Sequence, residues 1–295
     1  MAAGEESTYE YFARDDVVAE YASLDFLFEP ETKILEELRP RLADARMLDV
    51  GVGAGRTTLH FAPLVREYVG VDVSAKMVEE CKRRFSGLGE RATFLVADVR
   101  DMAALEDESF DIVLFSFNGL DIVGDHEERL KSLRELHRVC REDGTLVFSA
   151  HNLAFAESSL SLRTSARETL SLVARRLSNL RKPRRVLRFA LRPLRRRSLN
   201  PGWRNLSAVE HALVVEERPR YEFSRTFYES ADERIRVRKY YVRPREQIRQ
   251  LSEIGFAGTR ILAPDGTEVP DPEWRGVRRW WWLYYVCDKR RETPA

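Results

Sequence analysis

The stretch Met47–Arg56, with the sequence MLDVGVGAGR, restricts the fold of this 295-residue chain more than any other. A short apolar run, typical of a buried parallel strand, leads into three glycines spaced two residues apart, Gly51, Gly53 and Gly55. The residues after them, TTLHFAPLV, are expected to form a helix. A glycine-rich turn between strand and helix lets a ligand approach the backbone, because no Cβ stands in the way. The stretch therefore predicts a ligand site in a parallel α/β fold.

The spacing of the glycines narrows the choice of ligand. The dinucleotide-binding fingerprint is G-x-G-x-x-G, whereas this chain has G-x-G-x-G with an acidic residue, Asp49, before the first glycine. A carboxylate at this place would repel a pyrophosphate. The turn is therefore expected to hold a cofactor that carries a positive charge.

Strands and helices alternate on both sides of this turn, which is typical of a parallel sheet. Strands are expected at 46–50, 67–72, 92–97, 110–117 and 145–150, and again at 228–242, 259–263 and 280–289. Helices are expected at 8–22, 34–42, 75–85, 126–141 and 244–255. The sequence thus predicts a doubly wound, Rossmann-like α/β fold with a mostly parallel seven-stranded sheet, an antiparallel last strand, and an α/β insertion over the carboxyl ends of the strands.

Four segments follow from this pattern. Residues 1–45 are expected to form an N-terminal helical lid, and residues 46–151 the cofactor-binding part of the core. Residues 152–242 are an inserted acceptor-binding or lid region, and residues 243–295 complete the core. The insertion contains a basic segment: residues 163–204 hold 14 Lys or Arg and a single acidic residue, Glu168.

The basic segment has several interpretations. It is either a solvated arginine-rich lid, an amphipathic surface for anionic lipid or a protein partner, or a site for a phosphate-bearing ligand such as a nucleotide-linked or lipid-linked sugar. Nucleic-acid binding ranks last, because the acidic remainder of the chain would repel a long polyanion.

Polar side chains mark the carboxyl ends of the strands, where open parallel sheets bind ligands. Asp72 ends the second strand, Asp98 the third, and Asn118 lies near the end of the fourth. Each alone could be a helix cap or turn residue. Together with Asp49 and the glycine turn, they predict that Asp72 accepts hydrogen bonds from ribose hydroxyls and Asp98 from an adenine amino group.

These motifs resemble those of class I S-adenosylmethionine-dependent methyltransferases: LDVGVGAGR is similar to that family's first motif, GVDVS to its acidic second-strand motif and VADVRD to its adenine-site motif. The resemblance covers about 46–151 and 243–289. It implies S-adenosylmethionine as cofactor and S-adenosylhomocysteine as product. No metal is expected, because the sequence has no obvious acidic cluster for a divalent cation. The cofactor-binding residues that it implies, with two tyrosines of the proposed lid, are Asp49, Gly51, Val52, Gly53, Gly55, Asp72, Val73, Met77, Asp98, Val99, Phe117, Asn118, Tyr11 and Tyr21.

Methyl transfer is an in-line displacement that needs alignment and a deprotonated nucleophile. His151 ends the fifth strand and is the candidate general base; the alternative is that it caps the strand or positions substrate. Tyr240 and Tyr241 are expected to line the acceptor pocket. The tyrosines of the lid could equally be packing residues.

The function expected from the sequence is methylation of an oxygen or nitrogen of a small molecule, such as a secondary metabolite or a sugar. The alternatives are an RNA methyltransferase that uses the basic segment, and a non-catalytic module on the same fold. The absence of an Asn-Pro-Pro-Tyr-type tetrad after the fourth strand disfavours methylation of exocyclic amino groups of bases. Three dispersed cysteines, with neither a secretory signal nor an 18-residue apolar run, predict a cytoplasmic protein without a transmembrane segment.

Overall fold

The computed structural model describes residues 8–123, 125–156, 224–232 and 235–290, with backbone alone for residues 8, 224–232 and 235–238. The basic segment 163–204 and most of the expected insertion 152–242 lie outside the described residues. Of the helices within the described ranges, none has both the length and the hydrophobicity to cross a membrane.

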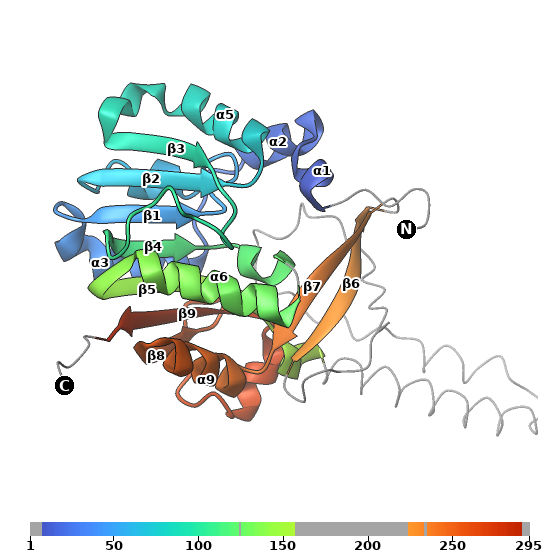
Figure 1. The fold of residues 1–295 in the computed structure, drawn as a ribbon. Helices are drawn as coiled ribbons and strands as arrows, with labels where there is room; N and C mark the ends of the chain where they lie inside the picture. Colours follow the sequence, from blue (N-terminus) through green and yellow to red (C-terminus); the bar gives the residue numbers. More distant parts are fainter. Residues whose placement is uncertain (1–7, 124, 157–223, 233–234, 291–295) are drawn as a thin grey trace, which may run out of the picture.

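Five parallel strands form the centre of the sheet, in the spatial order β3-β2-β1-β4-β5 (Figure 1). Their bounds are β1 Arg46–Val50, β2 Glu67–Asp72, β3 Ala92–Val96, β4 Phe110–Phe115 and β5 Cys140–Asn152. Two C-terminal strands extend the sheet beyond β5: β9 (Trp282–Lys289) is antiparallel to β5, and β8 (Phe256–Leu262) is antiparallel to β9. The doubly wound fold with an antiparallel last strand is confirmed.

The region expected to be one strand at 228–242 forms a two-stranded hairpin instead. Strand β6 (Ser224–Asp232) runs antiparallel to β7 (Ile235–Val242). The hairpin adds two strands to the seven expected, so the described part of the sheet has nine. Strand β4 pairs with β5 only as far as Phe148, whereas β9 pairs with the other edge of β5 up to His151. Strand β7 therefore takes the edge left free beyond β4, where it pairs in parallel with His151 and Asn152.

Helices cover both faces of the sheet (Figure 1). The α-helices are α1 Thr8–Phe12, α2 Asp15–Ala22, α3 Glu29–Leu42, α4 Thr58–Phe61, α5 Ala75–Arg84, α6 His126–Val139 and α9 Pro244–Ile254. The short 3₁₀ helices are η1 Ser86–Arg91, η2 Gly119–Ile122 and η4 Arg275–Arg279.

Three helices differ from the expectation. The segment expected as one helix at 8–22 is broken at residues 13–14 into α1 and α2. Helix α4 has only four residues, because Pro63 follows closely and cannot donate a backbone hydrogen bond. Helix α6 ends at Val139 rather than at 141, since β5 begins at the next residue.

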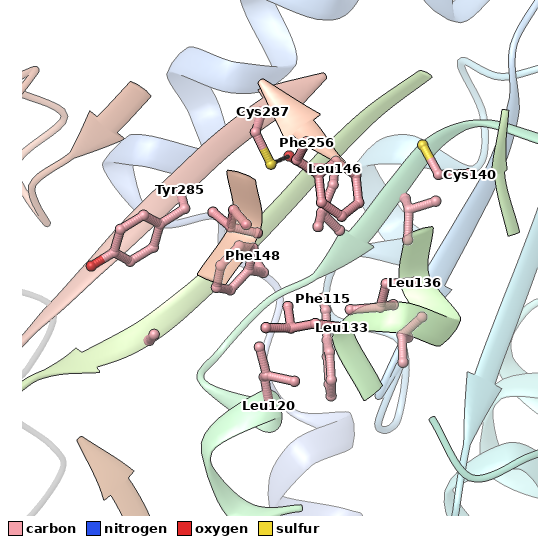
Figure 2. Close-up of a cluster of buried hydrophobic side chains, with 14 of the residues drawn as sticks. Phe115, Leu120, Leu133, Leu136, Cys140, Leu146, Phe148, Phe256, Tyr285 and Cys287 are labelled. Carbon is pink, nitrogen blue, oxygen red and sulfur yellow. Dashed lines mark hydrogen bonds between the residues drawn. The ribbon is translucent and has the colours of Figure 1, made fainter. Parts of the chain in front are cut away.

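The core consists of two apolar layers, one on each face of the sheet. Alternate residues of β1 show the division: Leu48 belongs to the layer under α6 and α9, and Met47 to the layer under α3, α4 and α5. Figure 2 shows the first layer, in which Leu133 and Leu136 of α6 lie near Phe115 at the end of β4. Because helices cover both faces of the sheet, the sequences of the central strands are nearly continuous apolar runs.

Candidate functional site

A cavity of about 370 Å³ opens at the carboxyl edge of the sheet, where the strand order reverses between β1 and β4. Helices α1 and α2 and the β6–β7 hairpin lie at this end of the molecule (Figure 1). Nine of the fourteen predicted cofactor residues line the cavity: Gly51, Gly53, Asp72, Val73, Met77, Asp98, Val99, Phe117 and Tyr21. The sequence motifs thus converge on one cavity of ligand size.

The glycine turn adopts a backbone that other residues rarely take. Gly51, Gly53 and Gly55 have φ angles of 63°, 55° and 89°. A Cβ at Gly55 would lie 2.2 Å from the Phe85 ring, and one at Gly51 would lie 2.9 Å from the Phe115 ring. Gly51 and Gly53 line the cavity, while Gly55 lies beside it and permits close packing against α5.

Asp49 supports the turn from beneath and does not line the cavity. Its Oδ2 accepts hydrogen bonds from Thr57 Oγ1 at 2.5 Å and from Tyr68 Oη at 2.6 Å. Burial raises the pKa of Asp49 to about 6, although the two hydroxyl hydrogen bonds lower it in part. The structure therefore holds a costly buried carboxyl group next to a ligand cavity.

Asp72 connects the turn to the end of β2. Its Oδ2 accepts a hydrogen bond from the Gly53 amide at 2.9 Å, and its Oδ1 from the Ser74 amide at 2.8 Å. Burial raises the pKa of Asp72. Each carboxylate oxygen has a second lone pair, so Asp72 can also accept from two hydroxyl groups of a ligand.

Asp98 lines the cavity but already has a charged partner that the sequence reasoning missed. Arg100 donates to both carboxylate oxygens of Asp98 through Nε and to Oδ2 through Nη2. Burial would raise the pKa of Asp98, but the hydrogen bonds from Arg100 hold it below its usual value. Arg100 also donates to Tyr9 Oη at 2.7 Å and to Glu128 at 2.8 Å, so it links the cavity to α1 and α6.

The turn after β4 is also strained. Phe117 and Asn118 are consecutive non-glycine residues with φ angles of 59° and 60°. The Phe117 ring lines the cavity and stacks on Phe28 with centroids 5.5 Å apart. Asn118 donates its backbone N–H to Ser149 Oγ at 2.7 Å, and its buried Oδ1 has no hydrogen-bond partner within the described part of the chain.

A buried ion pair supports this strained turn. Arg56, the last residue of the glycine motif, donates from Nη1 and Nη2 to the carboxylate of Glu31 in α3, both at 2.6 Å. Tyr284 Oη in β9 donates to the same carboxylate at 2.6 Å, and Ser116 Oγ also donates to it. The guanidinium carbon lies 5.5 Å from the Phe117 ring centroid. Sequence reasoning missed this cluster because its members come from four distant segments.

His151, the predicted base, is 3% exposed and is not among the residues that line the cavity. Its Nδ1 lies 2.8 Å from Oδ2 of Asp121, a residue of η2 that the sequence reasoning did not single out. Gly119 and Ile122 of the same short helix do line the cavity. One turn of η2 therefore separates His151 from the cavity.

Tyr240 and Tyr241 are buried, with exposed fractions of 2% and 1%, and neither lines the cavity. Tyr240 Oη is 2.6 Å from His126 Nδ1, and Tyr241 Oη accepts from Trp281 Nε1 at 2.7 Å. Their expected contact with an acceptor stays a prediction.

Two further predicted residues, Val52 and Tyr11, lie next to the cavity without lining it. Val52 donates its backbone N–H to Val71, and Tyr11 packs in a small apolar cluster with Met77. Tyr9 and Phe12 of α1 line the cavity in place of Tyr11. The N-terminal helices thus do contribute aromatic rings to the cavity.

The chemistry of the lining fits a cationic adenosine cofactor. Its charged members among the described residues are Asp72 and Asp98, with no Lys or Arg to pair with a pyrophosphate. Tyr21 and Phe117 offer aromatic rings that attract a positive charge. Searching the described ranges finds no cluster of three or more His, Cys, Asp or Glu that could bind a metal.

Comparisons with known proteins match part of this chain to methyltransferases. Residues 47–144 match a family model described as a methyltransferase domain. The chain is 31% identical over 109 residues to an uncharacterized methyltransferase, YcgJ, of Bacillus subtilis, which covers 37% of this chain and 42% of the relative. It is 35% identical over 107 residues to the ubiquinone/menaquinone biosynthesis C-methyltransferase UbiE of Citrifermentans bemidjiense. That match covers 35% of this chain and 43% of the relative. The chain thus spans less than half the length of these curated relatives.

Solved structures resemble the fold over almost the whole chain. The CcbJ methyltransferase from Streptomyces caelestis has a TM-score of 0.57 at 14% identity, covering 97% of this chain and 100% of that one. An S-adenosylmethionine-dependent methyltransferase from Clostridium acetobutylicum has a TM-score of 0.55 at 11% identity, covering 94% and 99%. Residues 47–144 thus match a methyltransferase domain, and the described fold resembles that of the two solved methyltransferases.

Proposed function

We propose that the chain transfers a methyl group from S-adenosylmethionine to an oxygen or nitrogen atom of a small-molecule acceptor, such as a secondary metabolite or a sugar. The observation that carries the proposal is the cavity, which combines the glycine turn and Asp72 with an apolar rim of Phe117, Ile122 and Val123. A cavity with a few placed polar groups and an apolar rim suits a small ligand.

Each lining residue has a proposed role in holding the cofactor, which when bound supplies a methyl group on a positively charged sulfur. Asp72 accepts from the ribose hydroxyls, and Val73 and Met77 pack on the adenine. Asp98 and the Val99 amide read the adenine edge, with Arg100 keeping Asp98 ionised and oriented.

The methionyl end is proposed to lie over Gly51 and Gly53, which leave the backbone open to a ligand. The rings of Tyr21 and Phe117, with centroids 6.3 Å apart, face this end and attract the sulfonium charge. Asp49 and Asn118 act from behind the lining: Asp49 fixes the turn, and Asn118 fixes the strained residue pair after β4.

On the acceptor side, His151 is proposed as the general base. The carbon acceptor printed in the name of UbiE belongs to that relative. The oxygen or nitrogen acceptor proposed here is supported by the pair of His151 and Asp121, which lies behind the η2 turn of the cavity wall. The basic segment 163–204 is proposed to recognise an anionic or phosphate-bearing group of the acceptor. Methylation of RNA through that segment is the alternative outcome of the test below.

The test supplies the purified protein with S-adenosylmethionine carrying a labelled methyl group. It is offered in parallel to a fractionated small-molecule extract and to tRNA and rRNA fragments at about 50 mM salt, where phosphate contacts are strong. We expect label in a small-molecule fraction and an equal amount of S-adenosylhomocysteine. Label in RNA would favour the alternative, an RNA methyltransferase, over the proposed small-molecule enzyme. If the cofactor binds but no label appears in any arm of the test, the proposed function is refuted.

Two variants calibrate this experiment. Asp72→Ala removes the proposed ribose acceptor and should abolish labelling. Asp25→Ala removes an exposed carboxylate and should leave the labelling unchanged.

A further inference from the structure

His151 belongs to a pair of links between β5 and the turn that follows β4. Ser149 and His151 are two residues apart in β5, so their side chains lie on the same face of the strand. Ser149 Oγ accepts from the backbone of Asn118, and His151 contacts Asp121, three residues further along. His151 therefore faces the segment that carries Phe117 and Gly119 of the cavity.

Asp121 is positioned to act on the His151 ring. One oxygen, Oδ2, accepts from the His151 backbone N–H at 2.5 Å and lies 2.8 Å from Nδ1. The other oxygen, Oδ1, receives only long contacts of 3.4 Å from Nε and Nη2 of Arg129. Arg129 makes shorter hydrogen bonds to Gln247 at 2.6 Å and Gln250 at 3.0 Å. The carboxylate is thus held by the arginine at a distance and bonded most closely to the histidine.

This contact decides which nitrogen of His151 carries the proton. An ionised carboxylate only accepts hydrogen bonds, so Nδ1 must carry the hydrogen and Nε2 must present a lone pair. Within the described ranges Nε2 makes no hydrogen bond, and the rings of Tyr241 and Trp281 lie beside the imidazole with centroids 4.8 and 5.4 Å away. The free lone pair has the form that a general base requires.

We infer that Asp121 is a positioning residue that holds His151 in the Nδ1–H tautomer, so that Nε2 can take the proton of a hydroxyl acceptor. The inference rests on the proposed methyl transfer and narrows its acceptor from oxygen or nitrogen to a hydroxyl group. A hydroxyl must lose its proton to become a good nucleophile, whereas a neutral amine already has a lone pair. A neutral amine attacks without first giving up a proton, so a base held by a dedicated carboxylate suits a hydroxyl acceptor better.

The proton and electrons balance in this step. The acceptor O–H bond breaks, its proton passes to Nε2, and its electron pair stays on oxygen. The oxygen then bonds to the methyl carbon, while the carbon–sulfur bond breaks and leaves its pair on sulfur. The products are a methyl ether and S-adenosylhomocysteine. Asp121 stabilises the imidazolium until it returns its proton to solvent.

The first test needs no acceptor. Long-range ¹H–¹⁵N spectra of the wild-type protein should show His151 with Nδ1 protonated and Nε2 unprotonated, and Asp121→Ala should abolish this preference. A wild-type spectrum with the proton on Nε2 would overturn the inference whatever the acceptor is. This measurement separates the inference from the proposed function, because it stands even if no acceptor is methylated.

The second test uses the labelling assay with the hydroxyl-containing fractions. Asp121→Ala and His151→Gln should bind S-adenosylmethionine as tightly as wild type, but lower kcat by about 10²–10⁴-fold with little change in KM. Asp125→Ala is the matched control, because it removes a carboxylate that caps α6 without touching His151. His151→Gln with undiminished kcat, or label found only in amine fractions, would overturn the inference. If Asp121→Ala does not fold, the wild-type spectrum and His151→Gln still decide it.

Discussion

Replacing Asp49 by asparagine should stabilise the protein at neutral pH. The side chain is 1% exposed, and burial raises its pKa from 3.8 to about 6. A rise of about two pKa units corresponds to about 3 kcal/mol of unfolding free energy. Because the folded state has the higher pKa, this group contributes stability below about pH 4, and that contribution is lost as the pH rises through about 6.

Asparagine has nearly the same shape and can accept the hydrogen bonds of Thr57 and Tyr68, but it does not ionise. Urea unfolding should show that Asp49→Asn raises the unfolding free energy by about 3 kcal/mol near pH 7.5 and by about 1 kcal/mol near pH 4.5. The exposed Asp25→Asn is the control, with little change at either pH. An equal effect at both pH values, or a loss of stability at neutral pH, would refute the assigned cost of burial.

The same variant should distinguish the cofactor from its product. Two unit charges about 10 Å apart attract by roughly 1.7 kcal/mol at an effective dielectric constant of about 20. Without the carboxylate, the affinity for S-adenosylmethionine should fall by about tenfold, whereas S-adenosylhomocysteine, which lacks the sulfonium, should lose much less. Calorimetric titration with both ligands measures the difference, and equal losses would contradict an electrostatic role of Asp49.

Two further predictions concern stability, and chemical unfolding measures both. Gly55→Ala should cost about 3 kcal/mol or more, because it combines a positive φ with a clash on Phe85. Gly258→Ala, with a positive φ and open space, should cost about 1 kcal/mol. Equal losses would contradict the packing role of Gly55. Glu31→Ala should cost about 3–5 kcal/mol of unfolding free energy, because it leaves the buried Arg56 guanidinium unpaired. The exposed Glu253→Ala should change that free energy by less than about 1 kcal/mol. A small loss for Glu31→Ala would show that water reaches the ion pair.

The cofactor side of the site could be predicted from the sequence because its residues follow the ends of consecutive strands. A buried parallel strand brings its last residue to the common carboxyl edge, so Asp72 and Asp98 reach the cavity by topology alone. The glycine turn could likewise be predicted from the sequence, since backbone positions with positive φ angles favour glycine.

The supporting contacts were not predictable, because no local pattern encodes them. Glu31 and Arg56 are 25 residues apart, and Asp121 and His151 are 30 apart, so each pair forms only through tertiary packing. Arg100 lies two residues after Asp98 and offered a signal that a charge pair would form there. The sequence predicts one strand over 228–242, because its alternating pattern does not mark the turn between β6 and β7.

The central claim is that the cavity binds S-adenosylmethionine through Asp72, and isothermal titration tests it most directly. Wild-type protein should bind S-adenosylmethionine with one site per chain, and Asp25→Ala should bind equally well. Asp72→Ala should lose at least about thirtyfold in affinity, since one hydrogen bond to a charged group contributes about 2 kcal/mol. Absence of binding to the wild type, or equal affinities of the wild type and a folded Asp72→Ala variant, would contradict the claim.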